Sequence, residues 1–164
     1  MKKHFIMQNK LLLPNKYKIL GWVLLIPATI LGIILTISGF DEDWITAKVF
    51  IFFTDEFFGE GKKFTFIKTN ITNTVVGILF ITGALLVGFS REKKEDEYIS
   101  NLRLSSLLWA VWVSYTLLLL SFVFVYGLAF FHVMVFNMFT VMIIFIVRFN
   151  YILYKNSKSV PDEK

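Results

Sequence analysis

Residues 90–103 hold the densest group of ionisable side chains in the chain. Glu92, Glu95 and Asp96 lie within five positions of each other, and on a helix they would share one face. Carboxylate oxygens on one face make a candidate cation site. No histidine lies nearby in the sequence and the chain has no cysteine, so nitrogen and sulfur ligands are missing. We therefore predict no metal site here.

The same run has the features of an exposed helix. Ser90 is a suitable N-cap, and Arg91 with Glu95 has the i,i+4 spacing of a helical ion pair. This predicts that the third hydrophobic helix begins at about residue 90 and extends about three turns into the cytoplasm. The extension is either a solvated helix or a docking surface for a protein partner. The candidate partner surface consists of Arg91, Glu92, Glu95, Asp96, Glu97 and Arg103.

A second polar set interrupts the last hydrophobic run. It comprises His132, Asn137, Thr140, Arg148 and Asn150, and the first four are the candidate intramembrane polar site. Asn137 and Arg148 are eleven residues apart, about three helical turns, so both lie on one face. Polar groups in lipid usually face the interior of a bundle, and we expect Asn137 to hydrogen-bond another helix. Arg148 is near the end of the run, where it can extend to the headgroups. One histidine without acidic residues in the spans is a poor proton path.

Sequence signatures of catalysis are missing. The chain contains no G-x-x-x-x-G-K-[ST], G-x-G-x-x-G, H-E-x-x-H or G-x-S-x-G motif, and it has no cysteine nucleophile. We predict no catalytic residues and no cofactor. An enzyme acting on lipid would need a polar cleft near Arg148, and this is the least favoured interpretation. The net charge of +5 comes mainly from the tails and one loop, which indicates membrane topology rather than nucleic-acid binding.

Four hydrophobic runs dominate the sequence. Hydrophobic residues make up 56% of the chain, more than a soluble domain of this size can bury. Each run has about the 20 residues that a membrane-spanning helix needs. They are continuously apolar rather than alternating, so an all-α membrane protein is expected and a barrel is not. The predicted spans are residues 19–40, 71–89, 104–126 and 128–154.

The first of these runs follows five lysines, as the core of a signal peptide would. It is longer than such a core and ends in Phe40-Asp41-Glu42-Asp43, without a small-x-small cleavage site. We interpret it as a retained span.

Basic residues predict the orientation of these spans. Lysine and arginine are concentrated in the N-terminal tail, in residues 90–103 and in the tail 155–164, whereas residues 41–70 contain six acidic residues and four lysines. The positive-inside rule then places both ends of the chain in the cytoplasm and residues 41–70 outside. The four-residue connection Gly127–Phe130 makes the third and fourth spans an antiparallel hairpin.

The outer loop has two interpretations. Residues 44–58 are rich in Phe, Ile and Val, and Asp41, Lys48 and Asp55 would share one face of a helix. This favours an interfacial helix on the membrane, as part of an outer interfacial segment of about residues 44–68. The alternative is a β-hairpin with strands 49–53 and 64–68.

Small residues four positions apart predict where helices approach closely. These stripes are Ala28-Gly32-Thr36, Ala84-Gly88 and Ser106-Ala110-Ser114. Pro27, inside the first span, removes one backbone donor and predicts a modest kink.

Several strings together resemble a group of small, uncharacterised multi-pass inner-membrane proteins of Gram-negative bacteria. The strings are Leu13-Pro14-Asn15-Lys16-Tyr17, Gly21-Trp22, Phe89 to Lys93, Glu95 to Ile99, Leu102-Arg103, Trp109-Ala110-Val111, Phe136 to Thr140, and Arg148 to Tyr151. The resemblance covers most of the chain except residues 41–70. It implies a location in the bacterial inner membrane and no known activity, substrate or cofactor.

The functional expectation is a non-enzymatic membrane protein that acts as an interaction, accessory or regulatory subunit. Its expected partners are the lipid bilayer and a membrane or cytoplasmic protein, or a second copy of the chain. The alternative is an oligomeric carrier or channel for a small solute or ion, which the polar residues of the last span would line.

Overall fold

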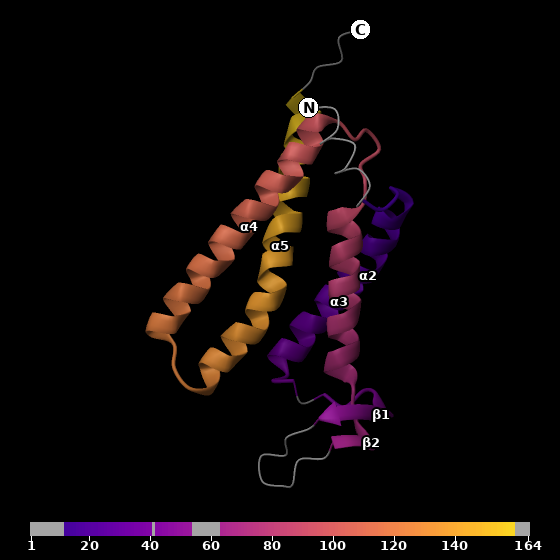
Figure 1. Cartoon of the computed structure of the whole chain (residues 1–164), viewed down its shortest axis with the longest axis vertical. Helices are drawn as coiled ribbons and strands as arrows, with labels where there is room; N and C mark the ends of the chain where they lie inside the picture. Colours follow the sequence, from indigo (N-terminus) through magenta and orange to yellow (C-terminus); the bar gives the residue numbers. More distant parts are fainter. Residues whose placement is uncertain (1–11, 41, 54–62, 160–164) are drawn as a thin grey trace. The chain divides into compact units, whose positions relative to one another are not determined.

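The computed structural model describes residues 12–40, 42–53 and 63–159. Its elements are α2 (Lys16–Ile37), β1 (Thr46–Phe53), β2 (Lys63–Asn70), α3 (Thr72–Phe89), α4 (Glu97–Phe124) and α5 (Leu128–Ser159) (Figure 1). Contacts divide the chain into two compact units. One is Leu25–Phe80, and the other comprises the chain up to Leu24 and from Ile81 onward. The division falls inside α2 and α3, so both helices contribute to both units.

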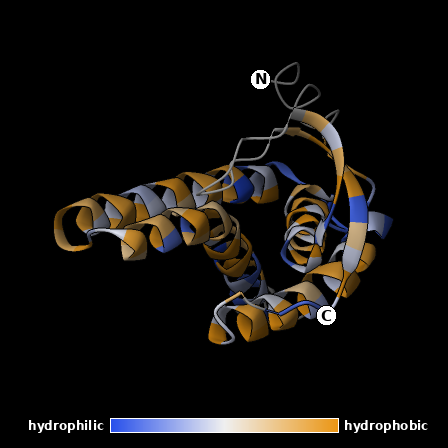
Figure 2. Ribbon diagram, turned by 90° about the horizontal axis from the view of Figure 1, so that it is seen from below, coloured by the Kyte–Doolittle hydropathy of each residue, from blue (hydrophilic) through white to orange (hydrophobic). Residues whose placement is uncertain are grey.

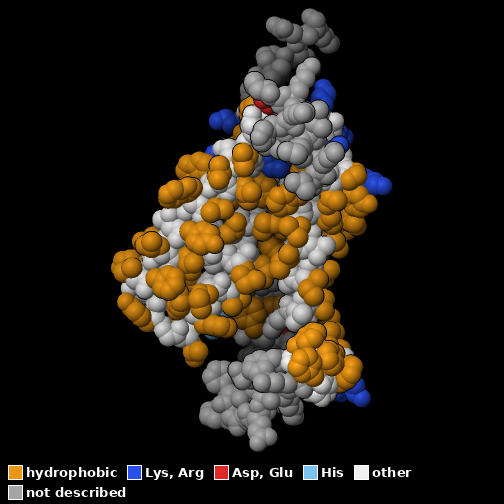
Figure 3. Space-filling model, viewed as in Figure 1, with side chains coloured by type: hydrophobic (Ala, Val, Ile, Leu, Met, Phe, Trp, Pro, Cys, Tyr) orange, Lys and Arg blue, Asp and Glu red, His pale blue; other side chains and the backbone are white. Residues whose placement is uncertain are grey.

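Within the described ranges, four helices are long and apolar enough to cross a membrane: Lys16–Ile37, Thr72–Phe89, Glu97–Phe124 and Leu128–Asn156. Figure 2 shows hydrophobic residues on all sides of these helices, and in Figure 3 hydrophobic side chains cover much of the visible helical surface. A helix that is apolar all round needs a lipid environment or a large protein core. The four helices support a mostly helical, multi-pass membrane protein.

The C-terminus of α2 is set by glycine. Gly39 has φ +70°, a left-handed conformation that glycine adopts without steric cost. The Phe40 N–H donates to the Leu35 carbonyl at 2.8 Å, and the Gly39 N–H donates to that of Thr36 at 3.3 Å. These two bonds form a Schellman motif, which satisfies carbonyls at the helix end. The helix therefore stops at Ile37, three residues before the predicted boundary, and it runs through Pro27.

Residues 46–53 and 63–70 pair as two strands, together called the hairpin below, and the favoured prediction of an interfacial helix is wrong. Strands β1 and β2 are antiparallel, with Val49 opposite Ile67 and Phe53 opposite Lys63, as the alternative expected. Aromatic and β-branched residues favour strands, and pairing two such segments adds cross-strand contacts that a single helix lacks. The heptad spacing of Asp41, Lys48 and Asp55 did not indicate a helix; Asp41 and Asp55 lie outside the described residues.

Helices α4 and α5 pack side by side in antiparallel directions (Figure 1). Ser106, Ala110 and Ser114 are fully buried on α4, as the small-residue stripe predicted. The other two stripes differ. Ala84 and Gly88 are buried, and Phe145 of α5 sits so close to Gly88 that any Cβ there would collide with its ring. In the first stripe only Ala28 is buried, whereas Thr36 is exposed and bonds its own helix.

Candidate functional site

The charged segment before α4 is an irregular loop, and the predicted helix start at Ser90 is wrong. The backbone of Leu13 pairs with residues 89–91: Leu13 N–H donates to Phe89, and Arg91 N–H donates to Leu13 at 2.8 Å. This pairing extends the chain at Ser90, so the backbone there cannot enter a helix. Residues 91–96 follow as a loop, and α4 begins at Glu97. Because residues 91–96 are not helical, the i,i+4 spacing of Arg91 and Glu95 does not correspond to one turn of a helix.

Asp96 is the N-cap of α4 instead. Its backbone is extended, and its carboxylate accepts a hydrogen bond from the Ile99 N–H at 2.8 Å. A carboxylate at this position satisfies a free backbone donor and interacts favourably with the positive end of the helix dipole. Asp96 therefore has a structural role.

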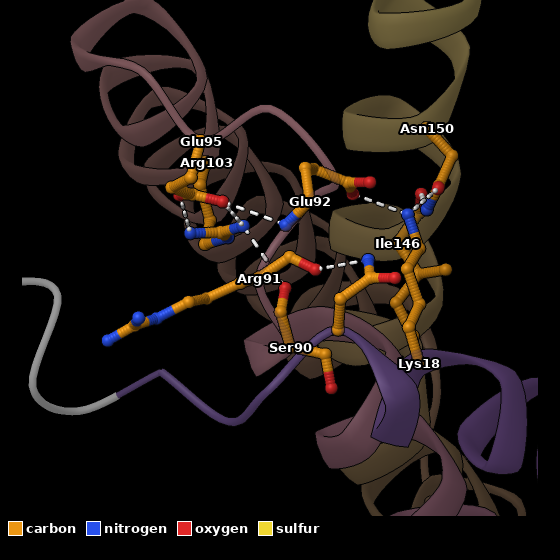
Figure 4. Close-up of polar contacts among 9 residues, drawn as sticks. Lys18, Ser90, Arg91, Glu92, Glu95, Arg103, Ile146 and Asn150 are labelled. Carbon is orange, nitrogen blue, oxygen red and sulfur yellow. Dashed lines mark hydrogen bonds and ion pairs between the residues drawn. The ribbon is translucent and has the colours of Figure 1, made fainter.

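Glu95 and Arg103 form a buried ion pair beside this cap. Arg103 Nη1 lies 2.7 Å and Nη2 3.2 Å from the two Glu95 carboxylate oxygens (Figure 4). The side chains are only 8% and 9% exposed. Arg103 also donates to the Ser90 carbonyl, and Glu95 accepts from the Glu92 N–H at 2.8 Å. One pair thus links the start of the loop, its middle and the first turns of α4.

A second ion pair connects the loop to α2. Lys18 of α2 binds Glu92, and its Nζ lies 3.3 Å from Asn150 Oδ1 of α5 (Figure 4). Both charged side chains are at most 15% exposed. Asn15 donates to the Arg91 carbonyl at 2.6 Å, which adds a contact from the segment before α2. The loop is therefore held by Asn15 and Lys18, which are 76 and 74 residues away from their partners in the sequence.

Phe149 lies within cation–π distance of the cations of both pairs. Its ring is 1% exposed, with Arg103 5.2 Å and Lys18 6.0 Å from its centroid. An aromatic face attracts cations, and the effect is larger where water is excluded. Phe149 therefore makes cation–π contacts with one member of each ion pair. The ion-pair cluster, as named below, consists of Lys18, Glu92, Glu95, Arg103, Phe149 and Asn150.

The structure thus separates the predicted partner surface into two groups. Glu92, Glu95 and Arg103 are engaged in the cluster, and Glu92, Glu95 and Asp96 do not share a helix face, because residues 91–96 are a loop. No group of three metal-ligating side chains occurs among residues 12–40, 42–53 and 63–159. Asp96 and Glu97 of the predicted surface are exposed, and so are the adjacent Lys93 and Lys94. Asp96 caps α4, whereas Lys93, Lys94 and Glu97 form no ion pair with another described residue. Arg91 extends away from the cluster (Figure 4).

The polar residues of α5 are not gathered into one site. His132 Nδ1 lies 2.9 Å from the Leu128 carbonyl oxygen, and Thr140 donates to that of Phe136. Both bonds stay within one turn of their own helix. Asn137 donates to the Ser114 carbonyl of α4 at 3.2 Å, so the expected interhelical hydrogen bond is confirmed.

Arg148 faces the same neighbouring helix as Asn137. Its guanidinium lies 4.6 Å from the centroid of the Trp109 ring, and its Nη1 is buried without a hydrogen-bond partner in the described chain. Stacking on tryptophan compensates part of the cost of holding this charge. The two residues share a face, as their spacing predicted, but each makes its own separate contact with α4.

A groove of about 530 Å³ runs along α4. Its lining includes Leu108, Trp109, Trp112, Val113, Thr116 and Leu117. These side chains are almost entirely apolar, and the Thr116 hydroxyl donates to its own helix at Trp112. Such a surface suits lipid chains. Among these six described side chains there is no set of oriented polar groups such as a solute or ion path requires.

Comparisons with protein-family models, with curated proteins and with solved structures found no match for this chain. The site must therefore be interpreted from its own geometry. Lys18 and Phe149 are the cluster residues that sequence reasoning did not single out. Lys18 is 74 residues from Glu92, and nothing in a sequence pattern marks that pairing.

Proposed function

We propose that this chain is a non-enzymatic membrane protein that acts as an accessory or regulatory subunit. It would bind a protein partner through the recognition loop, defined here as residues 91–96 together with Glu97, the first residue of α4. The observation that carries the proposal is a contrast within this loop. Its buried charges are paired, whereas Lys93, Lys94 and Glu97 are exposed and form no ion pair within the described part of the chain.

Such a loop is suited to recognition because its conformation is fixed before binding. The Arg103–Glu95 and Lys18–Glu92 pairs hold it at two points, and Asp96 fixes its junction with α4. A preorganised loop loses less conformational entropy when a partner docks. Exposed charges of both signs then favour partners with complementary charges and disfavour others.

The proposal includes an orientation and a location. We propose that both ends of the chain and the recognition loop are in the cytoplasm, and that the hairpin is outside, in a bacterial inner membrane. The support is the concentration of lysine and arginine in the N-terminal tail, residues 90–103 and the C-terminal tail. The resemblance to small inner-membrane proteins, expected from the sequence strings, motivates the same location.

The α5 residues give less support to a carrier. Asn137, Thr140 and His132 bond to backbone carbonyls, and the groove on α4 is apolar. Side chains that are engaged in this way have less capacity to hold a passing solute. The interaction role therefore takes precedence over the transport role.

Site-specific photo-crosslinking tests the proposal. A photoreactive amino acid replaces Lys94 in the membrane-embedded protein, and the same amino acid at Leu119, a 64% exposed position on α4, is the control for lipid-facing sites. We expect a protein adduct from position 94 that the Leu119 position does not give. The combined variant Lys93→Glu/Glu97→Lys should reduce that adduct at least tenfold, whereas Lys158→Glu should leave it unchanged.

Glu95 and Asp96 are left intact because their replacement would disturb the fold of the loop. If position 94 gives no protein adduct, or if the adduct persists after charge reversal, the loop is not the recognition surface.

A further inference from the structure

The two faces of the hairpin differ in exposure. Side chains alternate between faces along a strand. Phe50 pairs directly with Phe66 across the strands, and the Phe52 ring lies 5.8 Å from that of Phe64. Three of these four rings are about 70% exposed and Phe50 is 46% exposed. Lys48 opposite Lys68 completes the face. This exposed set, Lys48, Phe50, Phe52, Phe64, Phe66 and Lys68, is called the aromatic face below.

The opposite face is of a different kind. Ala47, Val49, Ile51, Thr65, Ile67 and Thr69 are all half-buried. The hydrophobic face of a two-stranded sheet normally turns inward, and its polar face turns outward. Here the larger hydrophobic side chains point outward instead, and Figure 3 shows them gathered over the hairpin. The backbone of Phe64 has φ +50°, a strained conformation for a bulky residue, and its ring packs edge-on against Phe52.

The hairpin is fixed to the ends of two membrane-spanning helices. Strand β2 ends at Asn70 and α3 begins at Thr72. Ile45 N–H donates to the buried Thr72 hydroxyl at 3.0 Å, and Ile71 N–H donates to the Ile45 carbonyl at 2.8 Å. Asn70 donates to the Glu42 carbonyl, so the segment leaving α2 is held to the end of β2. The base of the hairpin is therefore held directly against the N-terminus of α3.

The lysines indicate the charge of what covers this face. Like charges directly opposite each other in a sheet are destabilising. Lys48 and Lys68 face each other, and no described carboxylate forms an ion pair with either. An anionic group between them would remove that repulsion. A second copy packed through the same face would instead bring four lysines together, which disfavours self-association.

We infer that the aromatic face is a lipid anchor. The four phenylalanine rings insert at the boundary between headgroups and acyl chains of the bilayer that the helices cross, and Lys48 and Lys68 bind lipid phosphates. Aromatic rings gain from burial at this depth, and lysine side chains reach the headgroups while their aliphatic stems stay in apolar surroundings. The inference rests on the four membrane-spanning helices and is independent of the partner proposed for the recognition loop.

The cysteine-free chain allows a direct test by spin labelling. Single variants Phe52→Cys and Phe66→Cys carry a nitroxide in phosphatidylcholine vesicles with or without phosphatidylglycerol. Collisions with oxygen, which concentrates in lipid, are compared with collisions with a water-soluble nickel chelate. Leu119→Cys is the lipid-exposed reference, and Thr65→Cys is the matched control on the opposite face of β2.

We expect the oxygen-to-nickel ratio at positions 52 and 66 to approach that at position 119 and to exceed that at position 65 several-fold. Phosphatidylglycerol should raise the ratio further, and Lys48→Ser/Lys68→Ser should abolish that increase. Free access of nickel to positions 52 and 66 would place the face in water. Exclusion of both reagents together with spin–spin broadening would show that a second copy of the chain covers the face, and this would overturn the proposal. A ratio that does not change with lipid charge would refute the role of the lysines.

Discussion

Replacing Glu95 by alanine tests whether the ion-pair cluster holds the recognition loop. The change removes the partner of Arg103 and leaves a guanidinium that is 8% exposed with one remaining acceptor, the Ser90 carbonyl. It also removes the acceptor of the Glu92 N–H. We therefore expect a large loss of stability, because the uncompensated charge stays buried.

The size of the loss follows from the burial of the pair. Removing one partner of a buried ion pair costs about 3–5 kcal/mol. For a chain of this length, Tm falls by about 2–4 °C per kcal/mol, so the expected decrease is roughly 6–20 °C. Glu97→Ala is the matched control, because Glu97 is exposed and forms no ion pair with a described residue. Its cost should not exceed about 1 kcal/mol, the value of a charge at a helix N-terminus.

The assay is thermal unfolding of the purified protein in mild detergent. The quantity measured is the fraction of protein that remains monodisperse after heating to each temperature. The double variant Glu95→Gln/Arg103→Met distinguishes the effect of leaving one charge unpaired from the effect of changing these two side chains. It removes both charges while keeping similar volumes, and should recover most of the lost Tm, since a neutral replacement of a buried pair is often close to neutral. A Glu95→Ala protein within 2 °C of the parent, or a double variant no better than the single one, would refute the reasoning.

Two further predictions concern α2 and α4. Gly21→Ala should destabilise the protein by about 1–3 kcal/mol, because its Cβ would lie 2.8 Å from the backbone nitrogen of Val87. The matched control is Gly32→Ala, whose Cβ meets no atom within 4 Å and which should be neutral or stabilising by up to about 1 kcal/mol. Equal Tm values for the two variants would contradict close packing at residue 21. Asp96→Ala should cost about 0.5–2 kcal/mol through loss of the bond from Ile99, and Asp96→Ser should restore most of it in the same assay. An Asp96→Ser protein no more stable than Asp96→Ala would count against the capping role.

Local sequence properties determined the membrane-spanning helices. Residues 71–89 were predicted as a span, and α3 occupies Thr72–Phe89. Length and uniform hydrophobicity suffice for this, because lipid leaves a backbone segment no partners except its own helix. The stripe Ser106-Ala110-Ser114 was equally informative, since small residues at helical spacing mark close approach. Asn137 also followed from the sequence, because a buried amide in lipid must find a partner.

Tertiary structure decided the charged loop and the hairpin. Ser90 has the side chain of an N-cap, but pairing with Leu13 holds its backbone extended and moves the cap to Asp96. In the hairpin, the backbone N–H and C=O groups of β1 form hydrogen bonds with β2. Whether residues 46–53 form a strand or a helix therefore depends on residues 63–70, which lie elsewhere in the sequence. Lys18 and Glu92 are paired because α2 and the loop meet in the fold. Sequence patterns report local periodicity, whereas contacts across 70 or more residues follow only from how the helices pack.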